Sequence, residues 1–86
     1  MYKIVVHHRA AKYLKNLPEN QKTRIKKKMN QLANDPFEFR GVKAMMGEWE
    51  GYRRIRIGDF RIIFWIDREK QTIYIDFIGA RGDVYK

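Results

Sequence analysis

Apolar residues recur at helical spacing in the first part of the chain. A short run, residues 2–6, is typical of a β-strand because Val5 and Val6 are β-branched. The next stripe has the spacing i, i+3, i+4 and i+7, which predicts an amphipathic helix over residues 9–17, and consists of Ala10, Tyr13, Leu14 and Leu17. Pro18 interrupts it and suits the first position of a second helix, which ends near residues 34–36 and has a stripe of Ile25, Met29, Leu32 and Ala33. We therefore predict a two-helix hairpin after the first strand.

The rest of the chain is dominated by strand-like runs. Residues 37–49 show little regular pattern, and only a short strand near residues 42–45 is expected there. Beyond Gly51, β-type runs occupy residues 52–57, 60–66 and 72–78. Gly58-Asp59 is a two-residue turn signal, and polar residues separate the last two runs. The pattern predicts a C-terminal antiparallel β-meander, with Gly79 just beyond its last strand.

Side chains alternate across a strand, so each run can be sorted onto two faces. One face is apolar throughout and comprises Ile55, Ile57, Phe60, Ile62, Phe64, Ile66, Ile73, Ile75 and Phe77. In the last run, the residues opposite this set are Thr72, Tyr74, Asp76 and Ile78. Two amphipathic helices would bury their stripes against the apolar face. We therefore predict an α+β fold with the helices packed on one face of the sheet.

The other face of the sheet combines guanidinium groups with aromatic rings. Its expected members are Tyr52, Arg54, Arg56, Arg61, Trp65 and Tyr74. Guanidinium groups pair bidentately with phosphate and rings stack on unpaired bases, so this composition suits single-stranded RNA or DNA. The alternative is a solvated face whose arginines pair with acidic residues such as Asp59, Asp76 and Glu50.

Length and composition exclude several other classes. A chain of 86 residues is expected to form one domain, and the absence of cysteine excludes disulfides, thiolate zinc sites and thiol nucleophiles. His7 and His8 would diverge on a strand, so we expect a structural junction there and no metal or other cofactor. No apolar run reaches the roughly 18 residues of a membrane span, so a cytoplasmic protein without a membrane partner is expected.

The charge points to a polyanionic partner. Nineteen Lys and Arg residues oppose ten Asp and Glu residues, for a net charge of +9. Residues 1–36 have a net charge of +7, and residues 37–86 of only +2. Four lysines of the second predicted helix lie off its apolar stripe and face water: Lys22, Lys26, Lys27 and Lys28. The alternative is that the chain is simply a soluble basic fold.

Two C-terminal stretches resemble a known family. Residues 52–61 (YRRIRIGDFR) and 78–85 (IGARGDVY) are similar to the RelE branch of the RelE/ParE superfamily, the toxins of bacterial and archaeal type II toxin–antitoxin pairs. The order of strand, helical hairpin with Leu17-Pro18 at its bend, and meander is also that of the family. The resemblance therefore implies a single RelE-like domain over residues 1–86.

The resemblance also implies an activity and a partner. Family members of the RelE type are metal-independent endoribonucleases that cut messenger RNA in the ribosomal A site, and an acidic RelB-like antitoxin inhibits them. Carried over by position, Arg61 and Arg81 would stabilise the reacting phosphate, Arg54 and Arg56 would hold the RNA backbone, and Tyr85 would orient or stack a base. The lysine-rich N-terminal part would contact ribosomal RNA.

The general base remains open at this stage. The best-known family member has lysines at the positions of Arg54 and Arg56, and an arginine cannot give up its proton. The alternatives are that Tyr85 or another group takes the proton, that ribosomal RNA assists, or that cleavage is driven mainly by orientation and charge. Two other functions compete with the ribonuclease: a ParE-like module that inhibits DNA gyrase by binding, and an RNA-binding protein without catalysis.

Overall fold

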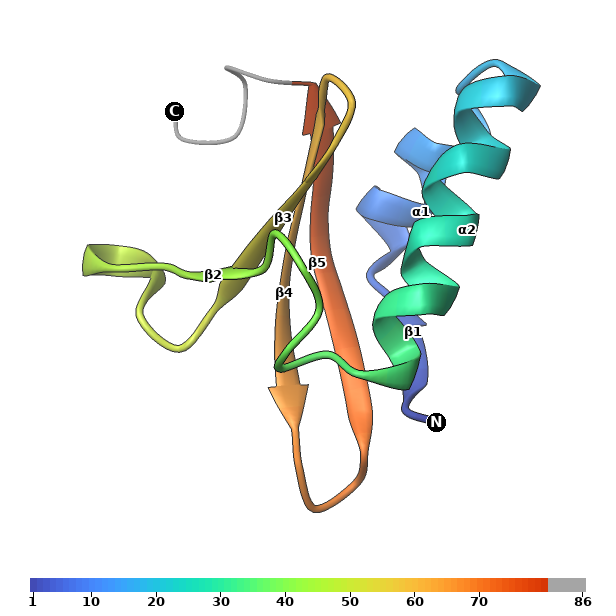
Figure 1. Cartoon of the computed structure of the whole chain (residues 1–86). Helices are drawn as coiled ribbons and strands as arrows, with labels where there is room; N and C mark the ends of the chain where they lie inside the picture. Colours follow the sequence, from blue (N-terminus) through green and yellow to red (C-terminus); the bar gives the residue numbers. More distant parts are fainter. Residues whose placement is uncertain (81–86) are drawn as a thin grey trace.

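Two helices cover one face of a five-stranded sheet (Figure 1). The computed structural model describes residues 1–80. Its elements are β1 (Lys3–Val6), α1 (His8–Lys15), α2 (Glu19–Asn34), β2 (Lys43–Ala44), the 3-10 helix η1 (Gly47–Trp49), β3 (Arg53–Ile57), β4 (Phe60–Asp67) and β5 (Thr72–Ala80). Within these residues, no helix is both long enough and apolar enough to cross a membrane.

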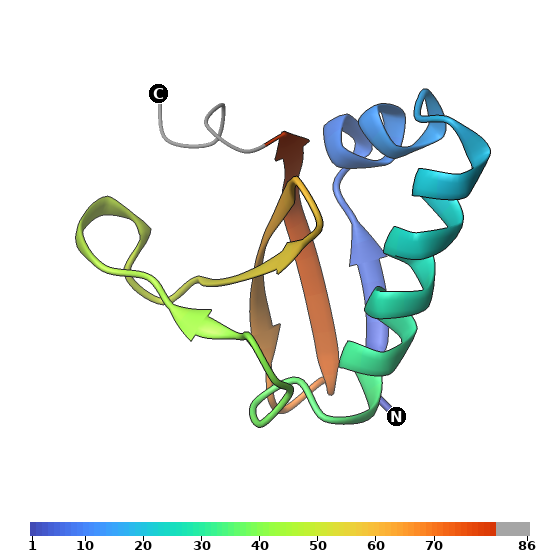
Figure 2. The same ribbon diagram turned by 45° about the horizontal axis from the view of Figure 1, so that its top comes forward.

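The strands lie in the order β1-β5-β4-β3-β2. The pairs from β2 to β5 are antiparallel, which confirms the predicted meander. The first strand, β1, is parallel to β5 and forms the far edge of the sheet, next to the helices in Figure 2. A local sequence pattern contains no information on this pairing, because a parallel partner can be any distant strand.

The helical hairpin forms as predicted, with small changes at its ends. The first helix begins at His8 because the His7 Nδ1 accepts a hydrogen bond from the Arg9 N–H at 3.2 Å. The two histidine rings lie close together, with centroids 4.3 Å apart and an angle of 31° between them, because His8 is already helical and does not continue the strand. The pair is therefore a junction, but its side chains do not diverge. Pro18 is the N-cap of α2 and not its first residue.

The main core lies between the helices and the sheet. Helix α1 packs against β5, and α2 lies across β1 and β3. The apolar stripes of both helices and the apolar face of the sheet meet there, with Ile25, Leu32, Ile62, Phe64, Ile73 and Ile75 almost completely buried. The α+β fold with its helices on one face of the sheet is confirmed.

The predicted face assignment fails at the end of β5. In the β4–β5 ladder, Ile63 is opposite Phe77, but the next residue, Phe64, is opposite Ile75. Asp76 is therefore an extra residue in β5, a β-bulge. A bulge shifts the phase of all later residues, and the alternation of one strand cannot reveal it.

The bulge exchanges the faces of the residues that follow it. Ile78 lies in the main core, although it was expected on the opposite face. Phe77 was expected in the main core, but it packs against a second, small core around Met45 and Ile63. This core lies on the face that no α-helix of residues 1–80 covers, which we call the helix-free face. The ring of Phe77 therefore lies on the same face of the sheet as the arginines.

The sequence predicted that Gly79 lies just beyond the last strand, but it belongs to β5. A Cβ atom at this position would collide with the ring of Phe77, which lies against the glycine backbone. Glycine is therefore required here by the close approach of a neighbouring side chain.

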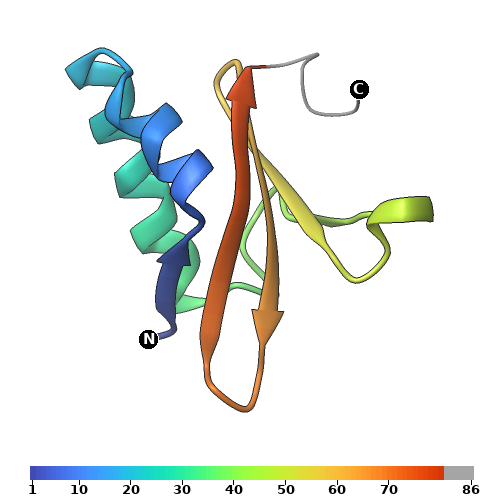
Figure 3. The same cartoon turned by 180° about the vertical axis from the view of Figure 1, so that it is seen from behind.

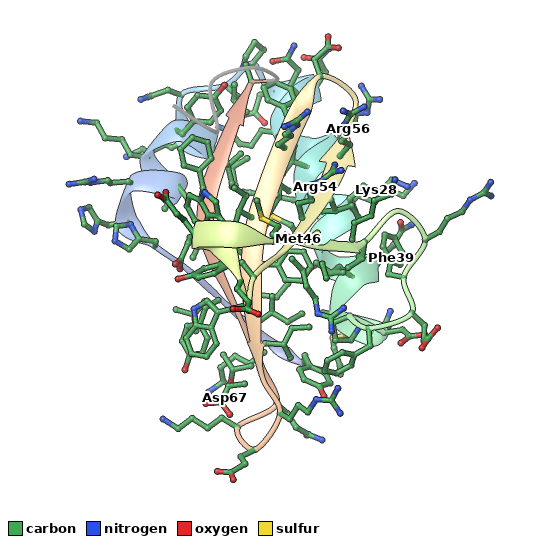
Figure 4. All side chains as sticks on the ribbon, turned by 90° about the vertical axis from the view of Figure 1, so that its left-hand side faces the viewer. Lys28, Phe39, Met46, Arg54, Arg56 and Asp67 are labelled. Atoms are coloured by element: carbon green, nitrogen blue, oxygen red, sulfur yellow. The ribbon has the colours of Figure 1, made fainter. Side chains whose placement is uncertain are left out.

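Residues 43–52 form an arm that leaves the sheet on the side away from the helices (Figures 1 and 3). It contains β2 and η1 and crosses in front of the sheet in Figure 4. Met45 and Trp49 of the arm pack with Tyr52, Ile63 and Phe77 in the second core. These contacts fix the arm against the helix-free face.

The contact between Phe77 and Gly79 predicts a stability effect. Gly79→Ala should lower the free energy of unfolding by about 1–3 kcal/mol, because the added methyl group overpacks the ring. In a Phe77→Leu background the same change should cost much less, since the ring is gone. Urea denaturation of the two pairs of proteins measures both losses. Equal losses in both backgrounds would show that the ring is not the cause.

Candidate nucleic-acid interface

Strand pairing brings four cations together on the helix-free face. Lys43 of β2 lies opposite Arg54 of β3, and Arg56 of β3 lies opposite Arg61 of β4. Directly opposed residues of antiparallel strands have Cβ atoms about 4.5–5.5 Å apart. Ile55 and Ile57 alternate with Arg54 and Arg56 along β3 and lie in the main core, so the two arginines point the other way. Lys43 and Arg61 share their face because directly opposed residues lie on the same side of a sheet. We refer to Lys43, Arg54, Arg56 and Arg61 as the cation cluster.

Three of the four residues of the cation cluster line a hollow. The hollow has a volume of about 270 Å³ and is lined by Gly41, Lys43, Arg54 and Arg56, with no acidic side chain among the described residues that line it. Arg56 is exposed, and Arg54 and Arg61 are half-buried. Arg54 and Arg56 project from the edge of the sheet in Figure 4. A phosphate bound beside these side chains could accept charge-assisted hydrogen bonds from several donors at once.

Sequence reasoning placed Arg54, Arg56 and Arg61 on this face but missed Lys43. The structure brings the three arginines together as expected and adds the lysine from β2. Lys43 lies in the segment with the least regular pattern, and its face depends on the partner of a strand of only two residues. The one available signal was its place inside the short strand expected near residues 42–45.

Tyr52 lies on the same face and is held by an acidic residue. Its hydroxyl donates a hydrogen bond to Asp76 Oδ2 at 2.9 Å. This hydrogen bond, together with partial burial and the charge of Asp76, raises the pKa of the Tyr52 hydroxyl above its usual value. Tyr52 is therefore a proton donor at neutral pH and a poor candidate for the missing general base.

Further aromatic residues occupy the face beside Tyr52. Trp65 and Tyr74 are cross-strand partners, and their rings stack with centroids 4.4 Å apart and an angle of 15° between them. Trp49 of η1 contacts Tyr52 edge to face, with centroids 5.3 Å apart. The helix-free face thus has a cationic part and an aromatic part, as its composition indicated.

The four lysines of α2 do not form one patch. Lys22 forms an ion pair with Glu19 at 3.3 Å, and Lys22 and Lys26 line a groove beside α1. Lys26 and Lys27 line a hollow on another side of the helix. Lys28 lies over the ring of Phe39, with its Nζ 5.7 Å from the centroid. Their charge is therefore spread around the helix.

Two predicted site residues, Arg81 and Tyr85, lie outside the described residues. Among residues 1–80, no group of three or more histidine or acidic side chains is arranged to hold a metal ion. The candidate interface within residues 1–80 consists of cations, aromatic rings and one tyrosine–aspartate pair.

Comparison with known proteins identifies several relatives. The family model described as the ParE toxin of type II toxin–antitoxin systems matches residues 4–85. The toxin RelE1 of Methanocaldococcus jannaschii is 31% identical over 87 residues, which is 99% of this chain and 96% of the relative.

Solved structures share the fold. The toxin–antitoxin complex RelBE2 of Mycobacterium tuberculosis matches with 25% identity and a TM-score of 0.81, over 93% of this chain and 98% of the other. The RelE–RelB complex of Pyrococcus horikoshii matches with 25% identity and a TM-score of 0.80, over 96% and 98%. The isolated Escherichia coli RelE toxin, at 17% identity, has the same fold with a TM-score of 0.80 over 99% and 89%.

The pair of Tyr52 and Asp76 predicts a titration shift. Asp76→Asn should lower the pKa of Tyr52 toward the ordinary value of about 10, because the charged acceptor is lost. NMR titration of the Tyr52 ring in both proteins measures the change. An unchanged titration would show that Asp76 does not control this hydroxyl.

The same pair should stabilise the fold in a defined pH range. A raised pKa means that the folded chain holds the phenolic proton more tightly than the unfolded chain. The stabilisation is therefore complete below about pH 10 and is lost as the pH rises through the pKa of the folded state. Tyr52→Phe should accordingly cost about 1 kcal/mol at pH 7 in urea denaturation.

Proposed function

Because the chain belongs to the RelE/ParE superfamily of type II toxin–antitoxin toxins, we propose that it is a ribosome-dependent endoribonuclease that cuts messenger RNA in the A site and stops translation. The observation that carries this proposal is the cation cluster on the helix-free face. Four cations from three neighbouring strands can grip one segment of RNA backbone, which a scattered basic surface cannot do.

The proposed reaction uses the RNA's own 2′-hydroxyl as the nucleophile. The 2′-oxygen forms a bond to the adjacent phosphorus, and the bond between phosphorus and the 5′-oxygen breaks. The products are a 2′,3′-cyclic phosphate and a 5′-hydroxyl, which takes up the proton that the 2′-hydroxyl lost. Negative charge builds up on the phosphorane oxygens, and fixed guanidinium groups stabilise it. The proposed step requires no metal ion.

We assign the roles by position in the cation cluster. Arg61 would contact the reacting phosphate, with Arg54 and Arg56 on the flanking backbone. Lys43 extends this set and would hold a neighbouring phosphate. Arg81 is two positions after Gly79, the cross-strand partner of Arg61, and its role as a second phosphate contact remains a prediction, as does that of Tyr85.

Dependence on the ribosome would explain why no general base is evident in the cation cluster. Guanidinium groups stabilise charge but do not accept the proton of the 2′-hydroxyl. Ribosomal RNA could position the substrate and assist the proton transfer. The spread of Lys22, Lys26, Lys27 and Lys28 around α2 suits a broad contact with ribosomal RNA, in which each lysine contacts a different phosphate.

We further propose that an acidic, RelB-like antitoxin binds and inhibits the protein. Two structural relatives with 25% identity are RelB-type toxin–antitoxin complexes. The net charge of +9 favours an acidic partner, and a partly disordered segment with an amphipathic helix could wrap around so small a protein.

Neutralising one arginine tests the catalytic assignment. Arg61→Gln should slow the cleavage of ribosome-bound mRNA by about 10²- to 10³-fold, because one electrostatic contact to the phosphorane is lost. The matched control is Arg68→Gln, an exposed arginine in the turn between β4 and β5, which should cleave at the normal rate. Single-turnover cleavage assays compare the three proteins, and retained antitoxin binding confirms their folding.

Two outcomes would contradict the proposal. Equal cleavage by the wild type and Arg61→Gln would remove Arg61 from the site. DNA damage with intact transcripts after expression of the toxin would favour the gyrase-inhibiting alternative, whereas cut transcripts and halted protein synthesis support the ribonuclease.

A further inference from the structure

A second, larger cleft lies next to the cation cluster. It has a volume of about 520 Å³ and lies between the start of α1, the arm and the end of β5. Its aromatic lining comes from three parts of the fold: Tyr13 of α1, Trp49 and Tyr52 of the arm, and Phe77 of β5. Arg9 and Asp76 supply charged groups to the same cleft.

The cleft and the cation cluster share a border. Gly79 lines the cleft and is the cross-strand partner of Arg61. Phe77, which also lines it, is opposite Ile63, and Ile63 is in turn opposite Arg54. If the cation cluster binds a phosphate of a ligand, the group attached to that phosphate can therefore reach the cleft.

The chemistry of the cleft fits a flat ring with hydrogen-bond donors. Aromatic side chains stack on the face of any nucleobase. Asp76 uses one oxygen to accept the Tyr52 hydroxyl, and a carboxylate has lone pairs for further donors. The Asp76 carboxylate can therefore accept a hydrogen bond from the amino group of a base such as cytosine. Uracil has no such amino group.

We infer that this cleft is a nucleobase subsite, which holds one base of a single-stranded RNA beside the phosphate on the cation cluster and prefers an amino-bearing base to uracil. The inference rests on the proposed function only in taking RNA as the ligand. The bulge at Asp76 is what creates the subsite, because it turns Phe77 toward the helix-free face and places the carboxylate beside it.

Titrations of the full chain with short RNAs test the subsite without any cleavage. The probes are 2′-O-methyl trinucleotides, which cannot be cut, with cytosine bases or with one base removed. NMR should show shifts at the Trp49 indole N–H and the Gly79 amide. Removal of the bound base should raise the Kd roughly tenfold, the size expected for one stacked base.

A pair of aromatic-to-leucine variants locates the effect. Trp49→Leu keeps an apolar side chain in the second core but removes the large aromatic face, so it should raise the Kd roughly tenfold. In this variant, removal of the base should have little further effect. Phe37→Leu is the control, because Phe37 packs edge to face against Tyr2, outside the candidate interface, and does not line the cleft. It should bind like the wild type.

The base preference is tested with uracil in place of cytosine. The wild type should bind the cytosine trinucleotide roughly fivefold to tenfold more tightly, by analogy with carboxylate recognition of cytosine. Asp76→Asn should reduce this ratio, since an amide also offers donors. Tyr52→Phe should retain the preference for cytosine, because the carboxylate of Asp76 remains. This variant shows whether losing the hydrogen bond between Tyr52 and Asp76 is enough to reduce the preference.

The outcomes separate the subsite from the ribonuclease. No binding, equal binding of the intact and abasic trinucleotides, or an equal loss in Phe37→Leu would overturn the subsite even if ribosome-bound mRNA is cut. Base-dependent binding without any cleavage on the ribosome would support the subsite and reject the ribonuclease. Equal affinity for cytosine and uracil would overturn the assigned base preference.

Discussion

The burial of one sheet face beneath the two helices determines on which face the arginines of the cation cluster lie. Ile55, Ile57 and Ile62 must be in the main core, so the residues between them must face the other way. A slip of one residue would place arginines beneath the helices, at the high free-energy cost of an unpaired buried charge. The same packing that stabilises the fold therefore positions the cation cluster.

A second constraint acts through the bulge in β5. Because Phe77 leaves the main core at this point, it can pack against Met45 and Ile63 on the opposite face. This small core fixes the arm, and the arm holds Lys43 beside Arg54 and Trp49 beside Tyr52. One extra residue in one strand thus contributes both to the cation cluster and to the aromatic cleft.

The sequence was sufficient for whatever depends on local periodicity. The helical stripes, the order of the strands along the chain and the faces of β3 and β4 follow from spacing alone, and so does the placement of Arg54, Arg56 and Arg61. The faces of Phe77 and Ile78 were wrong because a bulge depends on the partner strand. Lys43 and the aromatic cleft were missed because the arm has no regular pattern and its packing on the sheet involves residues far away in the sequence, such as Ile63 and Phe77.

The resemblance of two C-terminal stretches added what periodicity could not supply. It led to the toxin superfamily that the comparisons show. The cleavage of RNA and its dependence on the ribosome are our proposals. The cation cluster is physically consistent with that chemistry, since stabilisation of a phosphorane requires fixed positive charge. The aromatic cleft extends it from the backbone of the RNA to one of its bases.

The central claim is that the cation cluster acts as one phosphate-binding surface, and the salt dependence of RNA binding tests it most directly. Affinities for a non-cleavable single-stranded RNA are measured by fluorescence anisotropy over a range of salt concentrations. Lys43→Gln and Arg54→Gln should each reduce the slope of log K against log salt by about 0.7, the value for one phosphate contact on a single strand. Lys70→Gln, in the exposed turn between β4 and β5, should leave the slope unchanged. Unchanged slopes for both cluster variants, or an equal reduction for Lys70→Gln, would contradict the account.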